Sequence, residues 1–417
     1  MSNQSATRPR DGVRQFLGHP WGLANLAGVE MWERFSFYGL QALLAFYLYY
    51  SVSDGGLGLS QEAALSIVGA YGGLVYLTSV AGAWVADRIL SAERTLFYSA
   101  ILIMFGHISL AVIPGFSGVG IGLVSIAVGS GALKTTSQVL LGDLYSREDK
   151  RRDGGFSIYY MGVNIGGLLG PLITNAFWGW KGFHWGFGTA AVLMAIGLAQ
   201  YVLMRRHTVE TAGHEVANPL PRSRYVPVAL GVVAAVALVA VLIATGVVKL
   251  SHLSTIVVVL ALVTAVTLWV QMHRSDLVTG EERSRLIGFI PMFAASVAFW
   301  SVFQQQFTVV ALYSDERLNR TFFGYELPPG VVQSLNPLFV ILFAGVFGVV
   351  WTKLGSRQPS YATKFSLALF IIGLATLVFL PFVGGGPNST PFWAIVVILF
   401  LFTMAELMLS PVGNSMA

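Results

Sequence analysis

Residues 28–39, GVEMWERFSFYG, hold three ionisable side chains within five positions: Glu30, Glu33 and Arg34. In a helix, positions 30 and 33 are neighbours, as are 30 and 34, so Glu30 and Arg34 can pair on one face. Two carboxylates beside one guanidinium cannot easily both stay ionised in a low dielectric. We therefore expect one of them to hold a proton near neutral pH, which is the chemistry of a proton relay. A structural ion cluster that only locks the helix is the alternative.

Two more charges interrupt apolar runs. Lys134 lies in the middle of SGALKTTSQVLLGDLY, and Glu406 lies in MAELMLSPVG, shortly before Pro411. A charge inside a membrane is costly unless it is paired or hydrated, so by default it marks function. We expect Lys134 to supply positive charge to a central cavity. The structural alternatives are a snorkelling lysine and a glutamate held by backbone groups at a kink.

The composition indicates the elements that must position these charges. Of 417 residues, 55% are hydrophobic and 11% are charged, whereas a soluble domain carries about 25% charged residues. This excludes an ordinary soluble enzyme, a disordered chain and a nucleic-acid binder. The absence of cysteine excludes disulfides, thiol nucleophiles and iron–sulfur clusters. No nucleophile–histidine–acid arrangement and no metal-ligand cluster occurs, so we expect neither an enzyme nor a metal site.

The apolar runs predict an all-α, multi-pass membrane protein, because each span needs about 20 apolar residues. The twelve expected helices cover about 21–50, 63–86, 95–113, 117–142, 155–177, 186–204, 225–248, 251–271, 287–313, 331–352, 362–381 and 391–413. Residues 205–224 read as a polar linker. The seventh and eighth spans are almost purely aliphatic, which is typical of a lipid-facing accessory hairpin. Two more spans would be needed for a second half that matches the first, so we expect the chain to be cut short.

Basic residues predict the orientation. With the N-terminus in the cytoplasm, 19 Lys and Arg residues fall in inside segments and 4 in outside segments. This bias favours that orientation strongly. We expect the protein to lie in the inner (plasma) membrane of the cell. The bias also explains the net charge of +5 without an anionic partner. Loop 314–330 then faces outside and is expected to be a connector, and Tyr47, Tyr49 and Tyr50 are expected to form an interfacial aromatic belt.

Five ordered motifs carry a resemblance to a known family. They are the E-x-x-E-R-F run at Glu30–Phe35, GAWVADRILSAERT at 82–95, FSIYYMGVNIGGLLGP at 156–171, SLNPLF at 334–339 and AELMLSPVG at 405–413. The chain resembles a bacterial proton-coupled oligopeptide transporter of the major facilitator superfamily. The resemblance implies two six-helix bundles around a central cavity that work by alternating access. It thus implies an N-terminal bundle at 1–206, linkers and the hairpin at 207–286, and the first four helices of a C-terminal bundle at 287–417.

The resemblance also implies symport of di- and tripeptides with protons, the proton being the coupling ion and no cofactor being needed. The partners are peptides, protons and the lipid bilayer, with no nucleic acid, and we expect a monomer. Glu30, Glu33 and Arg34 would couple the proton. The peptide site would comprise Arg34, Tyr38, Tyr76, Lys134, Asn164, Trp300, Gln304, Asn336, Glu406 and Ser410. Arg34 and Lys134 would bind the peptide carboxylate, and Glu406 with Asn164 and Asn336 would bind the amine or amide.

One departure from the family pattern concerns the run Phe299–Gln305, where the family usually has an acid at the position of Gln304. If that acid normally pairs with Lys134, the pair is missing here, and we expect the coupling of proton and peptide transport to be altered. The alternatives are a transporter of the same fold for a non-peptide solute, such as nitrate or a drug-like compound, and a non-transporting membrane sensor.

Overall fold

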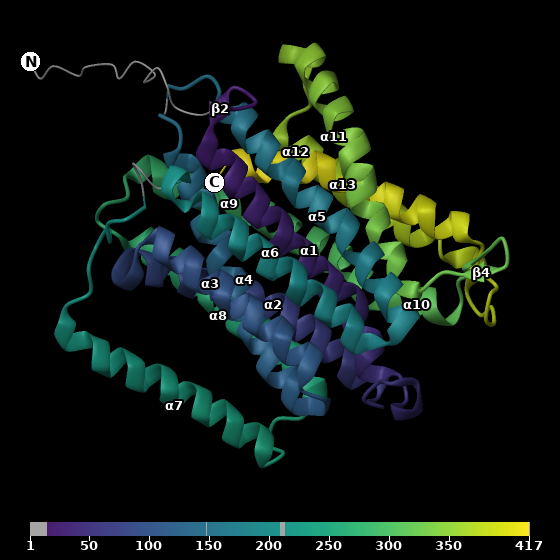
Figure 1. Ribbon diagram of the computed structural model, residues 1–417. Coiled ribbons are helices and arrows are strands. Elements are labelled where there is room, and N and C mark those ends of the chain that lie inside the picture. Colours follow the sequence, from purple (N-terminus) through teal and green to yellow (C-terminus); the bar gives the residue numbers. More distant parts are fainter. Residues whose placement is uncertain (1–14, 147, 209–212, 417) are drawn as a thin grey trace, which may run out of the picture.

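Membrane-length helices dominate the computed structural model, which describes residues 15–146, 148–208 and 213–416 (Figure 1). In this part of the chain, 11 helical segments are long and apolar enough to cross a membrane. The first helix, α1 (Trp21–Tyr49), is not among them because its charged and hydroxyl side chains lower its hydropathy. Most of α1 is nevertheless buried by its neighbours. With α1 included, the helices correspond to the twelve expected spans.

Six helices form the first group, with the charged run in α1. The helix α1 is followed by α2 (Gln61–Val85), α3 (Ala92–Val112), α4 (Gly115–Asp143), α5 (Arg152–Lys181) and α6 (Phe183–Thr208). α1 packs against α5 and α6, and α3 packs along α4. Figure 1 shows α1 in purple in the middle of this group. Their shared hydrophobic cluster runs from Leu23 to Tyr201 and also takes in Phe307 and Ala311 from further along the chain.

The next two helices form a separate hairpin. α7 (Tyr225–Ala244) and α8 (Leu253–Arg274) contain no buried residue, although α8 packs against α2. Figure 1 shows α7 standing apart from the other helices. In a membrane, these exposed aliphatic faces would contact lipid, as the composition of the two spans predicts.

The remaining helices build a second hydrophobic cluster, from Phe299 to Leu409. They are α9 (Gly280–Phe303), α10 (Val309–Glu316), α11 (Leu335–Leu354), α12 (Tyr361–Leu377) and α13 (Phe392–Met416). α12 and α11 pack on α13, and α11 also touches α5. Two short hairpins, β1–β2 (Gln15–Phe16 and His19–Pro20) and β3–β4 (Thr321–Phe322 and Tyr325–Glu326), lie at opposite ends of the molecule (Figure 1).

The prediction of one helix over 287–313 is wrong in two respects. The helix begins earlier, because Thr279 and Glu282 form a capping box at its N-terminus. It also breaks: α9 ends at Phe303, a 3₁₀ turn covers Gln304–Phe307, and α10 follows. Thr308 has φ −124° and ψ −84°, outside the helical region, so the two helices cannot be continuous.

Glycines allow α1 and α5 to approach closely. A Cβ atom added at Gly166 would lie 2.9 Å from the Phe35 nitrogen and 3.1 Å from the Arg34 Cβ, and one at Gly170 would meet the Phe35 carbonyl oxygen. Gly39 is similarly filled by Thr174. Gly166 and Gly170 therefore serve helix packing. Small residues at such a contact let the two backbones approach, which brings the α5 side chains within reach of Arg34.

We therefore expect Gly166→Ala to destabilise the protein by about 1–3 kcal/mol, because its methyl group would push α1 away from α5. The measurement is thermal unfolding of the purified protein in detergent. The matched control is Gly120→Ala in α4, where an added Cβ has no atom within 4 Å. Equal melting temperatures for the two variants would contradict this account of the α1–α5 contact.

Candidate functional site

The charged run of α1 lies inside the first hydrophobic cluster. Glu30, Glu33 and Arg34 are 3%, 0% and 5% exposed. The Arg34 Nε atom is 3.1 Å from Glu30 Oε1 and 2.6 Å from Glu33 Oε2. The predicted pair of Glu30 and Arg34 is present, and Glu33 joins it. The positive end of Arg34 also lies over the Phe37 ring, 5.1 Å from its centroid.

The two carboxylates have different surroundings. Glu30 Oε2 accepts hydrogen bonds from the Tyr159 hydroxyl of α5 at 2.7 Å and from the Ser137 hydroxyl of α4 at 3.0 Å. The two hydroxyls are 2.6 Å apart. For Glu33, the described side chains provide no hydrogen bond to either oxygen. Arg34 is its nearest counter-charge, and Lys134 lies further off within electrostatic range. An ionised carboxylate without hydrogen bonds is the costlier one to bury, and adding a proton to Glu33 would remove that cost.

Lys134 comes from the middle of α4 and points to α2. Its Nζ atom lies 4.5 Å from the ring centroid of Tyr76, which is itself 49% exposed. The structure records no ion pair between Lys134 and a carboxylate of the described residues, although Lys134 is within electrostatic range of Glu33. A lysine ammonium over an aromatic face is a favourable contact, but it leaves the positive charge available to a ligand.

The second cluster supplies a carboxylate held by an amide. Asn336, near the start of α11, donates to Glu406 Oε2 at 3.1 Å and to the Thr403 hydroxyl at 2.9 Å. Both acceptors belong to α13, one turn apart. Thr403 in turn donates to the Leu399 carbonyl oxygen at 2.8 Å. The amide of Asn336 therefore fixes the orientation of Glu406, which is half-buried.

Tyr38 connects the two groups of charges. Its ring stacks on Phe307, with the centroids 6.0 Å apart, and so joins α1 to the turn between α9 and α10. Its hydroxyl is within electrostatic range of Arg34, Tyr76, Tyr160 and Glu406. Positive and negative groups from both clusters thus face one region, which is the arrangement needed to hold a molecule with both charges.

The other expected site residues are less closely connected to these charges. Asn164 donates to the Tyr160 carbonyl oxygen of its own helix at 2.8 Å. Trp300 packs edge to face against Phe299 and Phe303 within the second cluster. Gln304 is half-buried at the start of the 3₁₀ turn that ends α9. The side chain of Ser410 lies outside the described residues.

Three contacts that position the site were missed from the sequence: Ser137 and Tyr159 at Glu30, and Thr403 at Asn336. Tyr159 was noted in the FSIYYMGVN motif, but the motif gives no reason to pair it with Glu30. Ser137 follows Lys134 by three positions, so helical spacing could have indicated that both lie on one face of α4. No comparable signal marks Thr403.

Side chains of both clusters meet at one end of the molecule. Asp315 of α10 accepts hydrogen bonds from Tyr49 at 2.5 Å and from Tyr50 at 2.8 Å, and Gln61 donates to Glu316 at 2.7 Å. Arg320 lies 3.6 Å from Asp315. Residues 314–330 are therefore more than a plain connector, because Asp315 and Glu316 join the two halves. The interfacial aromatic belt at Tyr47, Tyr49 and Tyr50 stays a prediction.

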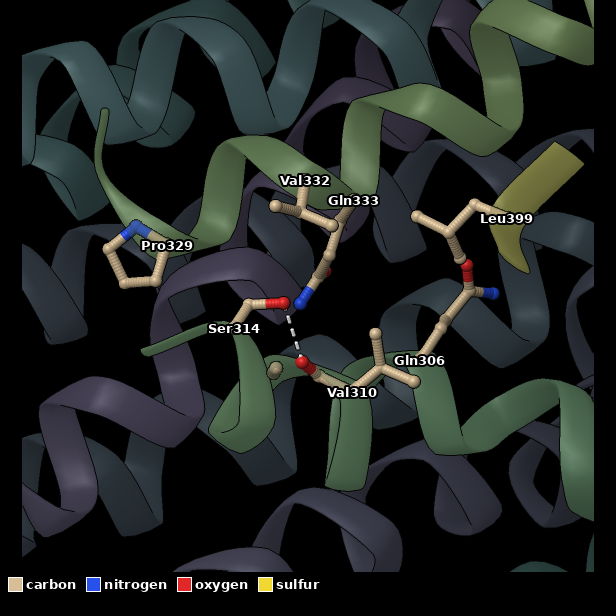
Figure 2. Close-up of a pocket in the computed structure, with 8 residues that line it drawn as sticks. Gln306, Val310, Ser314, Pro329, Val332, Gln333 and Leu399 are labelled. Carbon is tan, nitrogen blue, oxygen red and sulfur yellow. Dashed lines mark hydrogen bonds between the residues drawn. The ribbon is translucent and has the colours of Figure 1, made fainter. Parts of the chain in front are cut away.

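A narrow cavity, too tight to hold a water molecule, lies behind this closed end, lined by α10, the turn before it, the 3₁₀ helix Pro329–Ser334 and α13. Figure 2 shows Gln306, Ser314 and Gln333 around it, with Ser314 donating to the Val310 carbonyl oxygen. Both side-chain polar atoms of Gln333 lack a hydrogen-bond partner among the described residues. At the opposite end of the bundle, the described residues show no recorded hydrogen bond between the two clusters.

Comparisons with known proteins agree with this architecture. A family model described as PTR2, POT family, matches residues 93–417. The transporter YclF of Bacillus subtilis, described as uncharacterized, is 42% identical over 403 residues, which cover 96% of this chain and 82% of that protein. A di-/tripeptide transporter of Lactococcus lactis subsp. cremoris is 37% identical over 417 residues, covering 97% and 84%.

Solved structures give the same result. The crystal structure of a peptide transporter POT in complex with sulfate has a TM-score of 0.90 and 42% identity, covering 97% of this chain and 83% of that one. A POT family transporter in complex with 5-aminolevulinic acid has a TM-score of 0.89 and 38% identity, covering 97% and 85%.

Proposed function

Since the chain belongs to the POT family, we propose that it is a proton-coupled symporter that imports di- and tripeptides by alternating access. The observation that carries the proposal is that Tyr38 lies within electrostatic range of Arg34, Glu406 and Tyr76, and that the Tyr76 ring in turn holds the ammonium of Lys134. A short peptide is a zwitterion at neutral pH, so its site needs cations for the carboxylate and an anion for the amine. The L. lactis relative is named for di- and tripeptides, which supports this substrate class.

In the proposed complex, the peptide carboxylate lies between Arg34 and Lys134. Arg34 offers a planar fork of donors. Lys134 adds a positive charge that forms no ion pair with a carboxylate of the described residues. The amine pairs with Glu406, which Asn336 holds in place. Tyr38 and Tyr76 add hydroxyl groups, while Asn164, Trp300, Gln304 and Ser410 line the remainder of the site.

We assign the transported proton to Glu33. While Glu33 is ionised, it holds Arg34 at 2.6 Å, and Arg34 is then shared between two carboxylates. A proton taken up on the Glu33 carboxylate cancels one of these attractions and frees Arg34 to meet the peptide carboxylate. Glu30 keeps its charge, because two hydroxyl groups hydrogen-bond to it. When the peptide leaves, Arg34 returns to Glu33 and the proton is released.

We propose an orientation from the basic residues of the loops and a conformational state from the end that is closed. With the N-terminus in the cytoplasm, most basic residues lie inside, and the end closed by Tyr49, Tyr50 and Asp315 faces outside. The structure then corresponds to a state that is closed to the outside. We propose that the bundle 1–206 and the helices of 287–417 rock against each other, with 207–286 as an accessory. We propose a monomer as the working unit.

The first experiment is dialanine uptake into proteoliposomes, with and without an inward proton gradient. We expect uptake to rise with the gradient and to be competed by other di- and tripeptides. Folded protein that takes up no dialanine under the gradient would contradict the peptide proposal. Gradient-driven uptake of nitrate or a drug-like compound instead would assign the fold to a non-peptide solute.

If Glu33 carries the proton, Glu33→Gln should remove the gradient-driven part of dialanine uptake. Peptide counterflow, which needs no net proton movement, should persist. The control is Glu281→Gln, an exposed carboxylate at the start of α9, for which both activities should equal those of the parent. Counterflow and gradient-driven uptake falling together would point to a structural role for Glu33.

The absence of a carboxylate partner for Lys134 can be tested with Gln304→Glu. If position 304 is that of the Lys134 partner, an acid there should pair with Lys134 and change the pH dependence of uptake. Gln305→Glu is the matched control, since it adds the same charge one position further along at an exposed site. Identical pH profiles for Gln304→Glu and the parent protein would mean that Gln304 does not occupy the place of a Lys134 partner.

Asp315 should hold the outer end closed, because two tyrosines of α1 and its C-cap donate to it. In a Ser314→Cys background, which is otherwise free of cysteine, Asp315→Asn should raise labelling by a membrane-impermeant maleimide added from outside. Ser314 is 1% exposed, so labelling reports opening of the cavity in Figure 2. Glu62→Gln, an exposed carboxylate near the same end, should leave labelling low. Unchanged labelling in Asp315→Asn would remove Asp315 from the closure.

A further inference from the structure

An open apolar groove, which the transport proposal does not use, lies between α2 and the hairpin of α7 and α8. The groove has a volume of about 510 Å³, and small-molecule sites span roughly 300–1,000 Å³. Its lining comes from three helices: Leu77, Val80, Ala81 and Trp84 of α2, Val228 of α7 and Thr264 of α8. Thr264 turns its hydroxyl to the Leu260 carbonyl oxygen of its own helix, so it presents little polarity to the groove.

Contacts at both ends of the hairpin hold the groove open. At one end, the Ser66 hydroxyl of α2 donates to the Ser254 hydroxyl and accepts from the Ser254 backbone nitrogen, both at 3.1 Å. At the other end, the segment before α7 pairs with the loop after α2. Asn218 N donates to Asp87 O at 2.9 Å, and Leu220 N donates to Arg88 O at 2.8 Å. The α7 helix itself has no buried residue, so its distance from α2 is set by these anchors.

The same pairing brings basic side chains to the rim. Arg88 lies opposite Leu220. Arg222 and Arg224 follow Leu220 in the short 3₁₀ turn just before α7. Val228 is one turn beyond Arg224, so the basic rim adjoins the apolar lining. Arg222 and Arg224 are exposed. The Arg88 guanidinium donates to the Asn218 carbonyl oxygen at 3.4 Å and forms no ion pair with a described carboxylate. Asp87 is the acidic neighbour, so the rim is positive overall.

We propose that this groove binds one anionic phospholipid of the cytoplasmic leaflet, with an acyl chain between α2 and α7 and the phosphate at Arg88, Arg222 and Arg224. In a bilayer, an apolar space beside exposed aliphatic helices is filled by hydrocarbon. Basic pockets at the cytoplasmic ends of membrane helices attract anionic head groups. The charge at the rim favours a lipid over a second copy of this chain, whose matching surface is equally basic.

The test is native mass spectrometry of the full chain released from nanodiscs that contain equal amounts of phosphatidylglycerol and phosphatidylcholine. We expect one phosphatidylglycerol to be retained in preference to phosphatidylcholine. Arg222→Gln with Arg224→Gln should lower that preference by about tenfold or more, because each basic residue near the surface contributes to anionic lipid binding. The control pair is Lys353→Gln with Arg357→Gln, exposed at the end of α11, which should keep the preference.

A second variant tests the acyl-chain position. Ala81→Phe would fill the groove and should abolish retention, whereas Val124→Phe, at a 55% exposed position of α4, should not. Thermal unfolding of each variant checks that the fold is kept. Three outcomes would each overturn the proposal. They are equal retention of the two lipids, an equal loss in the arginine pair and the control pair, and retention of the lipid by Ala81→Phe.

Discussion

A guanidinium buried with two carboxylates is the constraint on which the first half of this protein depends. Arg34, Glu30 and Glu33 are almost fully removed from solvent, so their charges must be balanced by one another and by nearby dipoles. That need accounts for the hydroxyl groups that α4 and α5 direct at Glu30. It also accounts for the glycines that let α5 come so close to α1. Helix packing and site chemistry are therefore one problem in this part of the molecule.

The balance is uneven, and the unevenness makes the cluster useful. Glu30 is held by Arg34 and by two hydroxyl groups, while Glu33 has Arg34 as its nearest partner and no hydrogen bond from a described side chain. A cluster with every member satisfied would be a permanent structural element. With one member left short of hydrogen bonds, a single proton changes which partner Arg34 prefers. The outer closure is similarly modest, since each hydrogen bond contributes about 0.5–1.5 kcal/mol net. A ligand with somewhat different affinities for two states can shift such an equilibrium.

Much of this could be predicted from the sequence. The twelve spans, the lipid-facing hairpin and the Glu30–Arg34 pair all follow from hydropathy and helical spacing, which are local properties. The contacts of Tyr159 with Glu30, of Asn336 with Glu406, and of Tyr49 and Tyr50 with Asp315 join residues far apart in the chain. Periodicity within one helix carries no information on such pairs. The break at Gln304 was also hidden, because glutamine is a good helix former and neither glycine nor proline marks the site.

That break gives the ninth span the mechanics of an elbow. The short α10 segment is tied to α1 through Asp315, and the turn before it through Phe307. The α9 helix extends from the break over 24 residues. At 1.5 Å per residue, this helix is about 36 Å long. A small change of backbone angle at Gln304, where α9 ends, therefore becomes a large displacement at the far end of α9 while Phe307 and α10 keep their contacts. Gln304 is the first residue of the turn, so a bend there changes the direction of its side chain.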